Sequence, residues 1–163
     1  MTVKKILFVI MILTAFSACA QKVTTLAAAY VIPTAADAKK MEQDIFSYIN
    51  EYRISIGLSS LQLSKEATTE AVNHSSDMAY KKTPFGHEGF NARMDNIIKT
   101  VGFIHASAEN VAAGYLSAKQ VVDGWLNSPG HKKNIEGDYK LTGIGVVTDG
   151  EGRLYFTQIF LRP

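Results

Sequence analysis

Apolar side chains recur every three or four residues after Ala38, which is the spacing that places them on one buried face of a helix. The positions are Met41, Ile45, Ile49, Tyr52 and Ile56. Acidic residues in this segment lie off that face, and a glycine, Gly57, follows it. The pattern predicts an amphipathic helix that stops at Gly57.

Three further helices are predicted by the same spacing. The first begins after Ser64, a suitable N-cap, and ends before Pro84; the second covers about residues 91–101. In the third, Ser117 stands three residues before Gln120, as in a capping box. Its apolar face carries Ala118, Val121, Val122, Trp125 and Leu126. A Ser-Pro-Gly sequence at residues 128–130 ends this helix, and His131 is expected in the turn that follows.

Strands are predicted at residues 105–111, 141–148 and 154–161, and the last two flank a D-G-E-G turn typical of a hairpin. The final segment, L-Y-F-T-Q-I-F-L, carries large apolar side chains on both of its faces. Helices must therefore cover both sides of the sheet. We expect an α+β fold, a three-layer α–β–α sandwich around a small antiparallel sheet.

The N-terminus has the pattern of an export signal. Lys4 and Lys5 precede a short apolar run, so residues 1–19 are interpreted as a signal peptide with a lipobox that ends at Cys19, the only cysteine. Lipidation of Cys19 is one outcome; cleavage after Ala20, within an A-x-A site, is the other. Residues 20–38 are interpreted as a tether and residues 39–163 as the folded domain. The protein is expected in the cell envelope as a lipoprotein, or secreted.

Charge and composition restrict the functional classes. With 163 residues and 47% hydrophobic content, the chain has enough apolar material for one core. Removal of Lys4 and Lys5 leaves 15 basic against 15 acidic side chains, so no basic field favours nucleic acid. The sequence also contains no G-x-S-x-G elbow, no H-E-x-x-H helix and no P-loop. The common hydrolase and zinc-protease signatures are therefore absent.

Seven motifs occur in one order along the chain. They are N-x-x-R at Asn50, H-S-x-D-M-A at His74, P-F-G-H ending at His87, A-E-N-V-A-A-G at Ala108, W-L-N-S-P-G-H-K-K-N-I at Trp125, G-I-G at Gly143 and Y-F-T-Q at Tyr155. This series resembles the bacterial branch of the CAP superfamily, which includes cysteine-rich secretory proteins, antigen 5 and pathogenesis-related class 1 proteins. The resemblance implies an α–β–α sandwich and an extracellular location.

Better known members of that family carry two histidines and two glutamates in one cavity. His87 and Glu109 match one of each, whereas Ser128 stands where the second glutamate is expected and Tyr155 where the second histidine is expected. His131 is the candidate for the missing imidazole. The ligand-binding residues expected from the resemblance are therefore His87, Glu109, His131 and Tyr155.

Each of these residues also has a structural interpretation. His87 and Glu109 can form a hydrogen bond between a loop and a strand, and His131 can anchor a turn. His74 lies on an apolar helical face and is interpreted as a core or capping histidine with its hydrogen bonds satisfied. His105 competes with His87, because strand alternation points it to the same side as Glu109.

Three functions remain open. The first is an exported, lipid-anchored CAP domain that binds a small molecule, a lipid or a protein in a His/Glu cleft, without catalysis. The second is a metal-assisted hydrolase of peptide, envelope polymer or nucleic acid, in which His87, Glu109 and His131 hold zinc. The third is a structural envelope protein that uses the domain only as an interaction surface.

Overall fold

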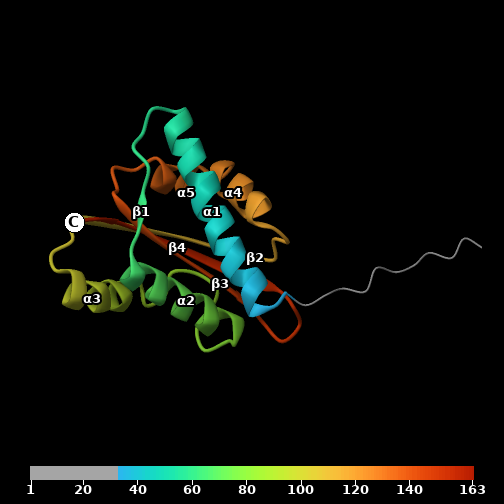
Figure 1. The fold of residues 1–163 in the computed structure, drawn as a ribbon. Coiled ribbons are helices and arrows are strands. Elements are labelled where there is room, and N and C mark those ends of the chain that lie inside the picture. Colours follow the sequence, from blue (N-terminus) through green and yellow to red (C-terminus); the bar gives the residue numbers. More distant parts are fainter. Residues whose placement is uncertain (1–32) are drawn as a thin grey trace, which may run out of the picture. The chain divides into compact units, whose positions relative to one another are not determined.

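The structure, a computed structural model, describes residues 33–163 as a four-stranded sheet with helices on both faces (Figure 1). In chain order the elements are α1 (Ala35–Ser55), β1 (Gln62–Leu63), α2 (Lys65–Ala79), α3 (Phe90–Val101), β2 (Ala106–Ala113), α4 (Ala118–Leu126), α5 (Pro129–Ile135), β3 (Leu141–Thr148) and β4 (Leu154–Arg162). The predicted signal peptide, Cys19 and most of the predicted tether lie outside the described residues.

The strand order is β1-β3-β4-β2, and the expected hairpin of β3 and β4 forms the centre. β2 pairs antiparallel with β4, with Glu109 opposite Ile159. β1 pairs parallel with β3, so the sheet is mixed and not purely antiparallel as expected. Only two residues of β1 pair, which is too short for an alternating pattern to reveal a strand in the sequence.

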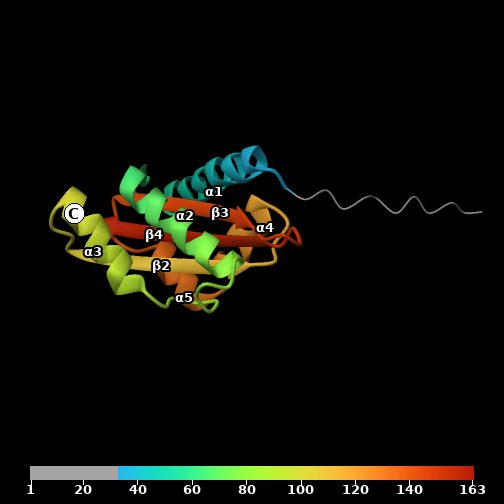
Figure 2. The same ribbon diagram turned by 90° about the horizontal axis from the view of Figure 1, so that it is seen from below.

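The two helical layers confirm the three-layer sandwich. α1, α4 and α5 pack on one face of the sheet in the larger core, which contains Trp125 and Phe156. α2 and α3 pack on the other face, where Ala71 and Ile159 lie in a second apolar cluster. Figure 2 shows α2 and α3 in front of the strands and α4 and α5 behind them. Residues 154–161 of β4 are all buried, which explains the apolar side chains on both faces.

Glycines in β3 allow α2 to lie directly on the sheet. A Cβ atom at Gly143 would overlap the backbone at Ala67, and one at Gly145 would overlap the backbone at Ala71. The G-I-G motif is therefore a packing requirement, in which the absence of side chains lets helix and strand backbones meet.

Two element boundaries differ from the sequence prediction. α1 begins at Ala35, inside the segment expected to be a tether, because Thr34 and Asp37 form a capping box. His131 does not lie in a turn but in α5, where Pro129 occupies the first turn of the helix. Proline fits that position because its missing N–H would have no helical partner there. Within residues 33–163, no helix is both long and apolar enough to span a bilayer.

Candidate functional site

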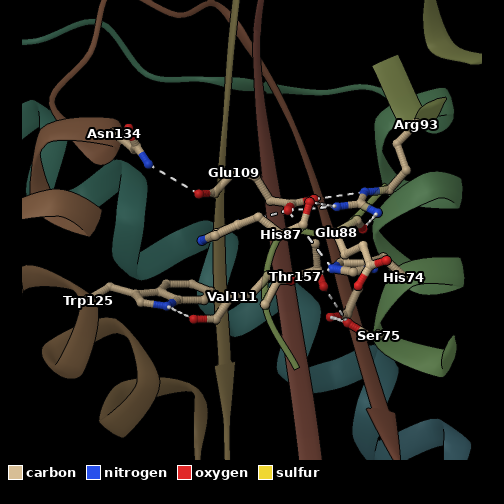
Figure 3. Close-up of polar contacts among 12 residues, drawn as sticks. His74, Ser75, His87, Glu88, Arg93, Glu109, Val111, Trp125, Asn134 and Thr157 are labelled. Carbon is tan, nitrogen blue, oxygen red and sulfur yellow. Dashed lines mark hydrogen bonds and ion pairs between the residues drawn. The ribbon is translucent and has the colours of Figure 1, made fainter. Parts of the chain in front are cut away.

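A buried carboxylate, that of Glu109 on β2, is the centre of the polar cluster on the α2 side of the sheet (Figure 3). Its side chain is 2% exposed. Arg93 binds both of its oxygens, with Nε 2.9 Å from Oε2 and Nη2 2.8 Å from Oε1. The Nδ1 atom of His87 lies 3.0 Å from Oε1. The expected contact between His87 and Glu109 is therefore present.

Arg93 joins this carboxylate to the loop that carries His87. Its Nη1 donates to the main-chain oxygen of Glu88 at 2.8 Å, and its side chain is 9% exposed. Arg93 was not among the predicted site residues. Its position in the sequence could have indicated burial, because Arg93 is next to Met94 and four residues before Ile97, and both of these apolar residues are buried on α3. A cation on such a face needs a buried anion as its partner.

His74 holds the same loop from α2. Its Nε2 lies 2.8 Å from the main-chain oxygen of Gly86 and 3.9 Å from Oε1 of Glu109. The ring is 2% exposed, and this burial lowers the pKa of His74 although the bond to Gly86 opposes the shift. The interpretation of His74 as a buried histidine with a hydrogen-bond partner is confirmed.

The imidazole of His87 is fixed on its inner side and open on its outer side. A carboxylate can only accept a hydrogen bond, so Nδ1 of His87 carries the proton that faces Glu109. In the neutral ring Nε2 is then an acceptor that points away from the carboxylate. The side chain is 54% exposed, so this nitrogen is presented to solvent.

His131 reaches the neighbourhood of His87 from the other helical layer. Burial lowers the pKa of His131, and the nearby charge of His87 lowers it further. α5 is fixed to β2 by two asparagines: Asn110 donates to the main-chain oxygen of His131 at 3.2 Å, and Asn134 donates to that of Glu109 at 3.2 Å. In the described structure the His131 side chain makes no hydrogen bond to Glu109.

Two other candidates lie away from the cluster. Tyr155 packs with Met78 and Val111, and its strand partner is Ala113, four residues beyond Glu109, a separation of roughly 13 Å along a strand. His105 is exposed and contacts the edge of the Phe103 ring, with 4.8 Å between ring centroids. Neither side chain joins Glu109.

The described residues do not fit a zinc ion. Among residues 33–163, no group of three or more histidine, cysteine, aspartate or glutamate side chains is placed to hold a metal. Glu109 gives both of its oxygens to Arg93, and the positive guanidinium occupies the side of the carboxylate that a metal would need. Glu109 is therefore engaged in a hydrogen-bonded cluster with His87 and Arg93.

Comparisons with known proteins agree with this fold. Residues 46–160 match the family model described as the cysteine-rich secretory protein family (CAP). The Bacillus subtilis membrane protein YlbC is 31% identical over 124 residues, which cover 74% of this chain and 34% of YlbC. YkwD of the same organism is 32% identical over 124 residues, covering 74% of this chain and 46% of YkwD. The chain thus spans about a third and just under half of these relatives.

Solved structures give the same result. An outer surface protein from Borrelia burgdorferi has a TM-score of 0.69 at 24% identity, and the match covers 77% of this chain and 95% of that protein. An extracellular protein with an SCP domain from Bacillus anthracis has a TM-score of 0.64 at 28% identity, covering 80% of this chain and 44% of its own. With the family model matching most of its length, this chain belongs to the cysteine-rich secretory protein (CAP) family.

Proposed function

We propose that this protein is an exported CAP-domain protein of the cell envelope, held there by a lipid on Cys19, that binds a ligand at the outer face of His87. The observation that carries the binding proposal is the orientation of one imidazole. Buried Glu109 fixes Nδ1 of His87, while the other ring nitrogen faces solvent. His131 lies on α5, which Asn134 joins to the Glu109 main chain.

The chemistry of that face favours a neutral ligand that donates hydrogen bonds. The charge of Glu109 is balanced by Arg93, so the cluster has little net field. His87 presents an acceptor nitrogen, which suits a hydroxyl or amide N–H. Because Glu109 holds the ring in one orientation, less side-chain entropy is lost when a ligand binds. A hydroxyl-rich envelope polymer has these properties.

The same geometry favours binding over hydrolysis. In hydrolases, a histidine paired with a carboxylate commonly acts beside a nucleophilic side chain or a metal-bound water. The nearby hydroxyl of Ser75 is buried and engaged, since it donates to the Gly145 main-chain oxygen at 3.0 Å and shares a hydrogen bond with the Thr157 hydroxyl at 2.8 Å. The arrangement around Glu109 does not fit zinc either. The metal-assisted hydrolase is therefore the weaker alternative.

Binding is tested by NMR titration of the chain from residue 20 onward with soluble peptidoglycan fragments. We expect saturable shifts at the amides of residues 85–89 and 131–134. His87→Ala should weaken binding about tenfold, as for the loss of one good hydrogen bond in a fixed site. His105→Ala, which removes an exposed imidazole outside the cluster, is the matched control.

Two results would overturn the binding proposal. Equal affinity of wild type and His87→Ala would place the ligand elsewhere. If chromatography shows that the wild-type protein cleaves the fragments, the protein is a hydrolase.

Anchoring is supported by the leader sequence and by the similarity of the chain to a membrane protein of Bacillus subtilis and to an extracellular protein of Bacillus anthracis. Cells grown with a tagged fatty acid should label the wild-type protein, and Cys19→Ser should lose both the label and the membrane fraction. Unlabelled wild-type protein that begins at Gln21 would replace the lipid anchor with secretion after cleavage.

A further inference from the structure

A pocket of about 370 Å³ lies between α2 and α3. Its α2 wall consists of Glu70, His74 and Asp77, which share one helical face at intervals of four and three residues. On the opposite side, Gly89, the N-cap of α3, has no side chain and Ala92 of α3 has a small one, which leaves the space open. A volume of this size is within the range of small-molecule sites.

The walls of this pocket carry a net negative charge. Glu70, Asp77 and Glu88 line it, and the one cationic side chain in the lining, Arg93, is neutralised by its two bonds to Glu109. Asp77 has a Lys82 partner at 3.4 Å, but both side chains are exposed, and such pairs contribute little.

One ring nitrogen of His74, a residue that lines the pocket, has no hydrogen-bond partner among residues 33–163. Nε2 of His74 faces the carbonyl oxygen of Gly86, which can only accept, so the proton is on Nε2. Nδ1 of the neutral ring is then an acceptor, and within residues 33–163 it makes no hydrogen bond.

The ring of His74 contributes to the lining of the pocket. His74 as a whole is 2% exposed, so its ring is almost entirely covered by protein. An unpaired acceptor on a buried side chain costs free energy unless something donates to it.

We infer that the pocket between α2 and α3 binds the primary ammonium group of a ligand. An ammonium group is a compact cation with three donors and no acceptor. It supplies the donor that Nδ1 of His74 needs, and it meets the carboxylates of Glu70 and Asp77. A neutral alcohol would satisfy the acceptor without balancing the charge, and a carboxylate would be repelled by the walls. The inference does not depend on ligand binding at His87.

The test uses n-butylamine as probe, with 1-butanol and butyrate as neutral and anionic molecules of similar size. Binding is followed through the ring resonances of His74 by NMR in the chain from residue 20 onward. We expect saturable binding of n-butylamine and at least tenfold weaker binding of the two others. Ala92→Leu, at an exposed helical position, fills the pocket without changing its charge and should abolish the shifts.

Charge variants distinguish binding in the pocket from nonspecific electrostatic attraction of the amine to the protein surface. Glu70→Gln combined with Asp77→Asn should weaken the amine about tenfold or more, whereas Glu51→Gln, an exposed glutamate on α1, should not. Equal binding of butanol and butylamine, no saturable binding of the amine, or binding unchanged by Ala92→Leu would each overturn the inference.

The carrier of the ammonium group can be an amino sugar or a peptide lysine. Glucosamine represents the amino sugar and Nα-acetyl-lysine amide represents the peptide lysine, and both are titrated in the same way. The carrier that binds more tightly than n-butylamine, and is lost in Ala92→Leu, identifies the source; weaker binding of both would limit the pocket to free amines.

Discussion

The guanidinium of Arg93 and the carboxylate of Glu109 form a two-point ion pair inside the protein, with both side chains less than a tenth exposed. The pair joins α3 to the edge strand β2. The same guanidinium donates a hydrogen bond to the main-chain oxygen of Glu88, in the loop that carries His87. Removing one member leaves a buried charge without its partner, which is costly because water cannot replace it.

Arg93→Met should therefore lower the free energy of unfolding by about 3 to 5 kcal/mol, measured by denaturant titration at neutral pH. The double variant Arg93→Met with Glu109→Leu should recover part of this loss, because both charges are then absent. Lys40→Met, which removes an exposed pair with Asp44, is the matched control and should change little. An Arg93→Met protein as stable as wild type would show that the pair is not formed.

Trp125→Ala should destabilise the domain by about 3 to 5 kcal/mol, because the indole is 1% exposed in the main core. Its Nε1 also donates to the Val111 main chain at 3.4 Å, so α4 would lose a polar contact with β2. Thermal unfolding followed by circular dichroism measures the effect. Phe103→Ala removes an aromatic ring that is 73% exposed and should stay within about 0.5 kcal/mol. Similar losses in both variants would contradict the placement of α4.

Stability should fall on mild acidification because of His74. Burial lowers the pKa of His74 in the folded protein, so the unfolded chain takes up a proton near pH 6.5 while the folded protein does not. The stabilisation is complete above about pH 6.5 and is lost as the pH falls below that value. Unfolding titrations between about pH 7 and pH 5 should show a flatter profile for His74→Gln, whose amide can still donate to Gly86. Identical profiles would mean that His74 titrates normally.

Gly145→Ala should cost about 1 to 3 kcal/mol, since the added methyl group overlaps the α2 backbone at Ala71 and forces helix and strand apart. Gly150→Ala is the matched control. It lies in the β3–β4 turn, where a Cβ atom has open space. That substitution should be neutral or slightly stabilising. Equal stability of the two variants, by denaturant titration, would contradict the close packing of α2 on β3.

Local patterns were sufficient to predict most of the fold. Ser64 and Ser117 mark helix starts that the structure confirms, and the alternation in residues 154–161 indicated a strand covered on both faces. β1 could not be predicted. Its two residues adopt a strand because they pair with β3, and a local preference for extended structure does not identify them. Pro129 was interpreted only as a helix end, although proline also suits a helix start.

The site was predictable only in part. Motif order indicated His87 and Glu109, and the structure joins them. Arg93 was missed because its role depends on a partner 16 residues away, which no periodic pattern can reveal. Tyr155 was included through its motif alone, whereas strand register moves it away from Glu109. Long-range pairing therefore decides which polar residues meet, and a local pattern carries no information about it.

The close seating of α2 on β3 also has a thermodynamic consequence for recognition. Because the two backbones touch at Gly143 and Gly145, α2 has no room to tilt inward, and its face bearing Glu70, His74 and Asp77 is already ordered before any molecule arrives. A ligand that binds to this face of α2 loses its own conformational entropy, but the helix, which is already ordered, loses little. Ligand selectivity of the pocket can then be changed by substitutions in residues 80–89 and in α3, while α2 keeps its position on the sheet.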